Sequence, residues 1–354
     1  MVIVLEDLVD LKAPNINKYG EENCFKFDGH YYLASNETSN HYWIVIYNKS
    51  LMEEEGIKEE DQPYALWKAG KWDWDHLESL ARKLTKDTSG NGEIDRWGLG
   101  NWFTRVFAYM NGVTFTEIDE HGNGKLNFND PRVVEALTFL EKAKTAGWYQ
   151  QDNSICQEGI QNRTLAMYME REYYPVNIVS KTDDEICYVP LPVGPHGDPN
   201  KYIFETDGYG IGNGSQSPTY AAKYIELCLD EWHKYDEALL KKNPPEINEL
   251  TKITSQNPWF PAKTANPIDT MLDMFLGEIV WGGNAPAAAI EKWTPKATAL
   301  LQDANKPLGK LEKLPFKPIN ETFDKPKSIE AFPVYTADGP SQITITAAKG
   351  KDAI

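Results

Sequence analysis

The chain has 354 residues, of which 41% are hydrophobic and 25% are charged, a composition typical of a folded globular protein whose length suggests two domains. Its formal net charge of −17 argues against nucleic acid or anionic lipid as a partner, because both repel an acidic surface. No apolar run approaches the roughly 20 residues that span a bilayer. The four cysteines are far apart and lack CxxC spacing, which disfavours a zinc site.

The first predicted elements are strands. Residues 25–27 and 31–33 flank a turn at Asp28-Gly29, and residues 42–47 are β-branched or aromatic on both faces. The second pattern is typical of a strand buried on both sides of an α/β sheet. Later apolar stretches predict further strands, at residues 165–169, 186–189 and 202–204.

Helices alternate with these strands, and several begin at recognisable caps. Asp73 is a predicted N-cap, and Asp130-Pro131 begins a helix that Gly147 ends. Other helices are predicted to begin at Ser217-Pro218 and Asn266-Pro267, and a last one to span residues 285–303. The alternation indicates α/β layers.

The composition changes after Asp303. Residues 304–328 combine lysine with proline, which predicts a semi-extended linker. Residues 333–335 and 342–346 resemble short strands around a turn. We therefore expect residues 329–354 to begin a β-rich domain.

The most specific motif is the loop at residues 87–95, DTSGNGEID. It is similar to an EF-hand calcium loop, because oxygen-bearing side chains alternate and a glycine permits the sharp turn. The candidate ligands of a structural calcium ion are the side chains of Asp87, Ser89, Asn91 and Asp95 and the carbonyl of Glu93. The twelfth position is Gly98, where an EF-hand has a glutamate, so the alternative is an Asx-rich turn held by its own hydrogen bonds. No other cofactor is indicated.

Enzymatic motifs are absent from the sequence. The glycine-rich run at residues 208–214 lacks the GxGxxG spacing of a nucleotide site, and there is no GxSxG motif or P-loop. Because acidic residues are many, the composition does not exclude the pair of catalytic carboxylates that a glycosidase needs. No sequence pattern selects a particular pair.

Aromatic residues gather in stretches that contain glycine, asparagine or proline. They are Trp102-Phe103, Tyr173-Tyr174, Tyr209 and Trp259-Phe260. Exposed rings beside polar residues suit sugar binding, because sugar C–H faces stack on rings and hydroxyls need fixed polar partners. For any single ring the alternative is ordinary packing in the core.

Several segments resemble, in the same order, those of family 1 extracellular solute-binding proteins, the receptors of carbohydrate ABC importers. Residues 27–32 (FDGHYY) and 43–51 (WIVIYNKSL) are similar to the family's FDGKYY and YYNKDLF, and residues 72–95 to its TWDEFLEAAKKLTKDTDGDGKID. Further similar segments are residues 129–131, 159–169, 189–195 and 210–222. The resemblance covers roughly residues 1–303.

The resemblance implies a type II periplasmic-binding-protein-like α/β fold, with two lobes joined by crossing strands and a ligand in the cleft between them. It places residues 1–47 and 207–254 in the first lobe, and residues 48–206 and 255–303 in the second. Position by position it points to the ligand-binding residues Asn36, Glu37, Thr38, Trp102, Phe103, Arg171, Tyr173, Tyr174, Asp207, Tyr209 and Trp259. Arg171 could hold a sugar hydroxyl or an acidic sugar.

The chain departs from the family at both ends. Family members begin with a signal peptide and βα units of the first lobe, whereas residues 5–11 here look like a later family segment. Residues 321–347 resemble the opening of a jelly-roll, carbohydrate-binding module. We expect an internal fragment with an incomplete first lobe, from a protein that is lipid-anchored at the cell surface or periplasmic.

The resulting hypothesis is a monomeric receptor, not an enzyme, that binds a sugar or oligosaccharide and delivers it to the permease subunits of an ABC importer. One alternative is a glycoside hydrolase with an appended sugar-binding domain. The other is a cell-surface carbohydrate-binding protein that uses the β-rich tail.

Overall fold

The computed structural model describes residues 2–16, 25–27, 29–36, 40–118, 124–175, 178, 181–242, 244–261, 266–304, 334–336 and 339–341. They belong to two units, Met1–Pro307 and Leu308–Ile354. In the second unit, β12 (Val334–Thr336) and β13 (Gly339–Ser341) pair antiparallel. The strand expected at residues 342–346 lies outside the described residues.

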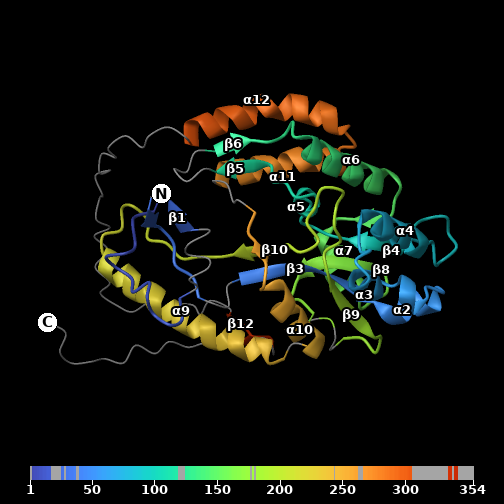
Figure 1. Ribbon diagram of the computed structural model, residues 1–354, viewed down its shortest axis with the longest axis horizontal. Coiled ribbons are helices and arrows are strands. Elements are labelled where there is room, and N and C mark those ends of the chain that lie inside the picture. Colours follow the sequence, from blue (N-terminus) through green and yellow to red (C-terminus); the bar gives the residue numbers. More distant parts are fainter. Residues whose placement is uncertain are drawn as a thin grey trace. The chain divides into compact units, whose positions relative to one another are not determined.

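A mixed sheet organises the described part of the first unit (Figure 1). Its strand order is β11-β10-β3-β8-β4-β7, and β9 also pairs with β3. The strands are β3 (Asn40–Asn48), β4 (Trp97–Gly100), β7 (Tyr149–Gln150), β8 (Leu165–Arg171), β9 (Ile186–Pro190), β10 (Tyr202–Thr206) and β11 (Pro258–Trp259). Two smaller antiparallel pairs are β1 (Lys26–Phe27) with β2 (His30–Tyr31), and β5 (Thr116–Ile118) with β6 (Gly124–Leu126).

Strand β3 is the centre of this sheet. It pairs antiparallel with β8 along one edge, and with β9 and β10 along the other. Residues 42–48 are all buried, which confirms the prediction of a strand buried on both faces. Because successive side chains point to opposite faces, Trp43 and Val45 join one core while Tyr42 and Ile44 join another.

Helices cover both faces of the sheet. They are α2 (Lys49–Glu54), α3 (Pro63–Lys68), α4 (Trp74–Leu84), α5 (Val106–Met110), α6 (Pro131–Thr145), α7 (Asn153–Gly159), α9 (Pro218–Leu240), α10 (Pro245–Thr254), α11 (Asn266–Val280) and α12 (Pro286–Ala304), with a 3₁₀ turn, η3 (Glu59–Asp61). The predicted caps are confirmed: the carboxylate of Asp73 accepts from the N–H of His76, and that of Asp130 from the N–H of Arg132. None of the helices in the described part of the chain is both long and apolar enough to cross a membrane.

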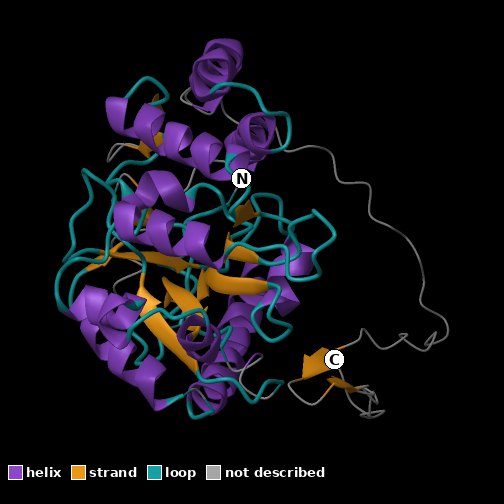
Figure 2. Cartoon of the chain, turned by 90° about the vertical axis from the view of Figure 1, so that its right-hand side faces the viewer, coloured by secondary structure: helices purple, strands orange, loops and turns teal. Residues whose placement is uncertain are grey.

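The apolar sides of the helices form two cores, one on each face of the sheet. Helices α4, α5, α6, α11 and α12 supply the largest hydrophobic core, on one face of β3. Residues of α7 and α10 contribute to a second core on the other face. Figure 1 shows α6, α11 and α12 above the sheet and α10 below it, and Figure 2 shows the strands enclosed between helices.

A third, separate core lies between the amino-terminal segment and α9. Its residues come from 5–34 and from 211–229. Strand β3 and helix α10, which the resemblance assigns to the first lobe, contribute to the sheet and to the second core. The division of the chain into two lobes, with its boundaries, stays a prediction.

The packing of α4 on β4 depends on Gly98. A Cβ atom at this position would lie 1.9 Å from the carbonyl oxygen of Ala81 in α4, so the helix backbone would have to move. We expect Gly98→Ala to lower the free energy of unfolding by about 1–3 kcal/mol. Gly212→Ala is the matched control, because its Cβ would meet no atom within 4 Å.

Urea unfolding followed by tryptophan fluorescence measures both variants. Equal midpoints for Gly98→Ala and Gly212→Ala would contradict this account of the helix–strand contact.

Candidate functional site

Three parallel strands end at one edge of the sheet. Strands β4, β7 and β8 run in the same direction, and β3 begins at this edge because it is antiparallel to β8. In sheets with parallel strands, ligands bind beyond the carboxyl ends. The loops that follow these ends carry Trp102, Phe103, Arg105, Gln151 and Tyr173. We call these residues, with Arg171 at the end of β8, the carboxyl-edge site.

The side chain of Arg171 is held by hydrogen bonds to two glutamates and by contacts with two aromatic rings. Its guanidinium lies over the rings of Trp43 and Trp102, with Cζ 4.8 and 5.2 Å from their centres. Nη2 and Nε donate to one oxygen of Glu205 at 2.7 and 3.0 Å, and Nη1 donates to Glu170 at 3.3 Å. Burial opposes the charge, but Glu205 and Glu170 keep the pKa of Arg171 above its usual value.

Glu170 fixes the indole of Trp102. Its Oε2 accepts from Trp102 Nε1 at 2.6 Å and from the hydroxyl of Tyr168 at 3.0 Å. Burial raises the pKa of Tyr168, so its hydroxyl stays protonated and donates. Glu172 is also engaged, since it accepts from the N–H of Tyr42 at 2.9 Å. Glu170 therefore holds Trp102 and Arg171 in place, and Glu172 ties the segment after Arg171 to the start of β3.

The rings form a stacked patch. Phe103 stacks on Trp43 with centroids 5.1 Å apart and planes 15° apart, and Trp102 lies 6.2 Å from Trp43. The rings of Tyr173 and His41 meet edge to face, with centroids 4.8 Å apart. Trp102, Phe103 and Tyr173 remain partly exposed. They can therefore present ring surface to a ligand.

A hollow of about 270 Å³ opens beside this patch. Residues Trp102 to Arg105 and Gln151 line it from the sheet side, and α11 lines it from the other. Across it, Arg105 Nη2 donates to Asp273 at 2.6 Å. Gln151 is only 6% exposed, yet neither its amide oxygen nor its amide nitrogen has a partner among the described residues. An unpaired buried amide costs about 1–3 kcal/mol, so this one is suited to meet a ligand.

The structure brings together some of the ligand-binding residues that were predicted from the sequence. Trp102, Phe103, Arg171 and Tyr173 lie at the carboxyl-edge site. Tyr174 points to the opposite core, where its hydroxyl donates to the carbonyl of Gln157 and its ring meets Tyr168.

The other candidates lie elsewhere. Asn36 is buried near α9, with its amide nitrogen 3.5 Å from the carbonyl oxygen of Leu229. Asp207 and Tyr209 are exposed beyond the end of β10, and Trp259 borders a different hollow. Glu37 and Thr38 lie outside the described residues. Ligand contact by any of these residues stays a prediction.

Sequence reasoning missed two residues of the site, Gln151 and Arg105, and the aspartate that pairs with Arg105. Gln151, Arg105 and Asp273 belong to no motif. One sequence feature could have indicated Gln151 as a site residue, because it directly follows the end of a strand. Asp273 comes from a helix 168 residues after Arg105, and nothing in the sequence joins the two.

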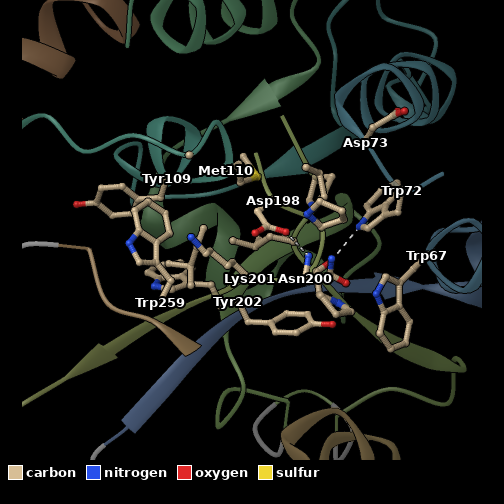
Figure 3. A pocket seen from close by; sticks show the side chains of 18 of the residues that line it. Trp67, Trp72, Asp73, Tyr109, Met110, Asp198, Asn200, Lys201, Tyr202 and Trp259 are labelled. Atoms are coloured by element: carbon tan, nitrogen blue, oxygen red, sulfur yellow. Dashed lines mark hydrogen bonds between the residues drawn. The ribbon is translucent and has the colours of Figure 1, made fainter. Parts of the chain in front are cut away.

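A larger hollow, of about 670 Å³, lies beside Trp43 (Figure 3). Much of its wall is the segment that joins β9 to β10, and none of its lining residues comes from the loops directly after β4, β7 and β8. The carboxyl-edge site is the better candidate for the main site despite its smaller volume, because the unpaired Gln151 and the held ring patch are there.

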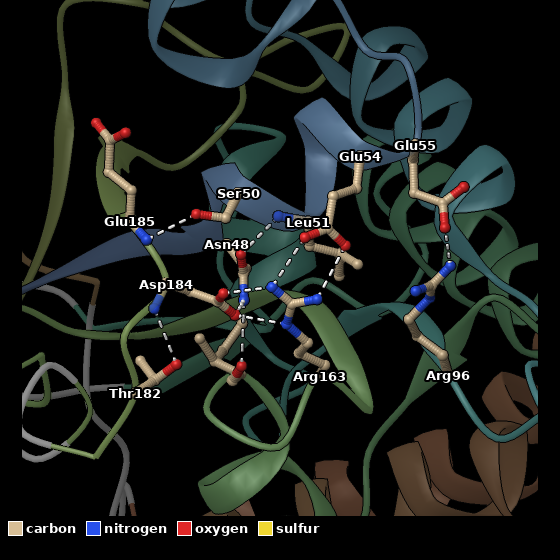
Figure 4. Close-up of polar contacts among 11 residues, drawn as sticks. Asn48, Ser50, Leu51, Glu54, Glu55, Arg96, Arg163, Thr182, Asp184 and Glu185 are labelled. Atoms are coloured by element: carbon tan, nitrogen blue, oxygen red, sulfur yellow. Dashed lines mark hydrogen bonds and ion pairs between the residues drawn. The ribbon is translucent and has the colours of Figure 1, made fainter.

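A second charged cluster, at the far end of β3, is structural (Figure 4). Arg163 donates to Asp184 at 2.8 Å and to Glu54 at 2.9 Å, and Asn48 donates to Asp184 at 2.6 Å. The Arg163 guanidinium keeps the pKa of Asp184 below its usual value. Arg163 has a φ of 60°, and these pairs hold it there.

The loop at residues 87–95 is held by its own hydrogen bonds. One oxygen of Asp87 accepts from the N–H of Gly90 at 2.7 Å and the other from that of Gly92 at 2.7 Å, while Asp95 accepts from Thr88 and Ser89. Among the described residues, no group of three or more His, Cys, Asp or Glu side chains could hold a metal ion. This geometry fits the Asx-rich turn, and calcium stays an untested prediction.

Comparison with known families assigns the chain. Residues 3–231 match the family described as bacterial extracellular solute-binding protein. Because the match covers more than half of the chain, the chain belongs to this family of binding proteins, which work outside the cytoplasm. No significant match to the chain is found among curated proteins.

Solved structures agree on the fold. An ABC substrate-binding protein from Listeria monocytogenes in complex with cycloalternan has a TM-score of 0.65 at 17% identity, over 85% of this chain and 80% of that chain. The MalE domain from Bdellovibrio bacteriovorus bound to maltotriose has a TM-score of 0.62 at 19% identity, over 85% of this chain and 80% of that chain. UgpB from Mycobacterium tuberculosis in complex with glycerophosphocholine has a TM-score of 0.62 at 16% identity, over 85% of this chain and 79% of that chain. The predicted type II periplasmic-binding-protein-like fold is thereby confirmed.

The Arg163–Asp184 pair predicts a pH dependence of stability. The folded-state pKa of Asp184 is lowered, so its contribution is complete above its unfolded pKa of about 3.9 and is lost as the pH falls through the lower folded value. We expect Asp184→Asn to lower the free energy of unfolding by about 1–2 kcal/mol at neutral pH, and this deficit to shrink as the pH falls below about 4.

Urea titrations across this pH range measure the deficit. Asp183→Asn is the matched control, since Asp183 is the exposed neighbour. A deficit that does not change with pH, or one that the control shares, would contradict the assignment.

Proposed function

We propose that the protein binds a neutral sugar or oligosaccharide at the carboxyl-edge site and delivers it to the permease of an ABC importer. The observation that carries this proposal is the partly exposed ring patch held beside the unpaired amide of Gln151. Aromatic faces attract the C–H faces of sugars, and a fixed amide can both donate to and accept from hydroxyl groups. The hollow between them supplies the space.

Charge supports a neutral ligand over an acidic one. Both arginines of the site are already paired with carboxylates, Arg171 with Glu205 and Arg105 with Asp273. A ligand phosphate or carboxylate would have to compete with these pairs. Of the three similar structures described above, two carry saccharides, cycloalternan and maltotriose, and one carries the phosphodiester glycerophosphocholine. The paired arginines favour the saccharides.

The proposed role needs no chemical step. Ligand binding would favour a closed arrangement of the two lobes over an open one, and the permease would recognise the closed form. The sugar would leave unchanged, so the protein would not be an enzyme. Such a receptor would work as a monomer, held at the cell surface by a lipid anchor or free in the periplasm.

Gln151→Leu tests the site without removing volume. Because it replaces an unpaired buried amide by an apolar group of similar shape, we expect the free energy of unfolding to stay equal or to rise by up to about 1 kcal/mol. We expect the affinity for the ligand to fall about tenfold, which corresponds to one lost hydrogen bond of about 1.4 kcal/mol.

Isothermal titration calorimetry with maltotriose, mannotriose and glycerophosphocholine measures the affinities, and chromatography of the recovered sugar tests for cleavage. Gln157→Leu, an exposed glutamine, is the matched control. Binding of neither saccharide, unchanged saccharide affinity in Gln151→Leu, or recovery of cleaved sugar would contradict the proposal.

A further inference from the structure

The larger hollow beside Trp43 is a separate feature of the molecule. Its volume of about 670 Å³ lies within the range of small-molecule sites. It shares no lining residue with the hollow at the carboxyl-edge site. We call it the β9–β10 pocket, because residues 190–203, which join these strands, form much of its wall.

This wall is fixed on one side by the segment before α4. The indole Nε1 of Trp72 donates to the carbonyl of Pro190 at 2.9 Å. The backbone N–H of Val193 donates to the carbonyl of Trp72 at 3.1 Å, and that of Trp74 to Val193 at 3.2 Å. These bonds hold the start of the wall against a buried tryptophan.

The wall is fixed on the other side by the end of α5. The N–H of Gly194 donates to the carbonyl of Met110 at 2.9 Å, and that of His196 to the side chain of Asn111 at 3.0 Å. A Cβ atom at Gly197 would lie 2.3 Å from the carbonyl oxygen of Met110, so the approach is possible only for glycine. A pocket whose wall is held in this way loses little entropy when a ligand binds.

Aromatic rings face the pocket from two sides (Figure 3). Tyr109 and Trp259 lie at one side, with ring centroids 6.2 Å apart and planes at 82°. Trp67 lies at the other side, and Tyr202 lies between them along one border. Trp67, Tyr202 and Trp259 are partly exposed, so their faces are accessible to a ligand.

Polar side chains lie between these rings. Asp198, Asn200 and Lys201 come from the fixed wall and occupy the middle of the pocket in Figure 3. The side-chain amide of Asn200 and the ammonium group of Lys201 pair with no other side chain in the described part of the chain. The carboxylate of Asp198 and the ammonium group of Lys201 have opposite charges. Together with Asn200 they offer hydrogen-bond donors and acceptors without a net charge.

We propose that the β9–β10 pocket is a second saccharide site, which binds a neutral sugar independently of the carboxyl-edge site. Rings at two sides can pack on sugar C–H faces, while Asn200 and Lys201 meet hydroxyl groups. A neutral ligand suits the balanced charge, and a saccharide combines apolar faces with many hydroxyls. One chain would therefore bind two saccharides.

The test is the stoichiometry of saccharide binding to the whole chain. Calorimetric titration with maltotriose and mannotriose, up to about 10 mM so that millimolar affinity is detected, should give two sites per chain. The double variant Asn200→Ala/Lys201→Ala changes exposed side chains only and should abolish one of the two, as should Trp259→Ala. Lys252→Ala, an exposed lysine on α10, should leave both intact.

Gln151→Leu separates the two proposals. It should weaken only the site that survives in the double variant. Two sites that the double variant leaves unchanged, or one site that only Gln151→Leu weakens, would overturn the β9–β10 proposal. A single site that is lost in the double variant and unaffected by Gln151→Leu would instead overturn the carboxyl-edge proposal.

Discussion

The paired, partly buried guanidinium of Arg171 is the constraint on which the carboxyl-edge site depends. It joins the end of β8 to β10 through Glu205 and lies over the indoles of Trp43 and Trp102. A charge that is largely removed from water is tolerable only when it is paired, because an unpaired charge there loses its hydration without compensation. The same contacts that neutralise this charge therefore also fix two aromatic rings and join β8 to β10.

The geometry of the remaining site follows from this arrangement. Glu170 belongs to the same network and orients Trp102, so the ring is held on both its edge and its face. Phe103 stacks on Trp43, which is itself held by the buried central strand. The rings are thus preorganised before any ligand arrives, and little conformational entropy remains to be lost on binding. Gln151, unpaired beside them, is the polar group that this arrangement leaves for the ligand.

Much of the fold could be predicted because its signals are local. The buried strand at residues 42–47, the caps Asp73 and Asp130 and the helix–strand alternation depend on neighbours in sequence. At the site, the residues predicted from the sequence were the aromatic residues that follow strand ends and Arg171, which the family resemblance indicated. Tyr174 was grouped with Tyr173, although it packs in the opposite core. The Arg105–Asp273 pair joins residues 168 positions apart, and the Gln151 amide is notable only for lacking partners, which no sequence pattern reveals.

Hydrogen–deuterium exchange of the whole chain, with and without a saturating neutral oligosaccharide, tests the central claim most directly. The account predicts that the sugar slows exchange in the peptides that cover residues 101–105, 150–152 and 170–174, because these loops and strand ends form the carboxyl-edge site. Exchange that is unchanged in all three segments while the sugar is bound would contradict the account and place the ligand elsewhere on the molecule.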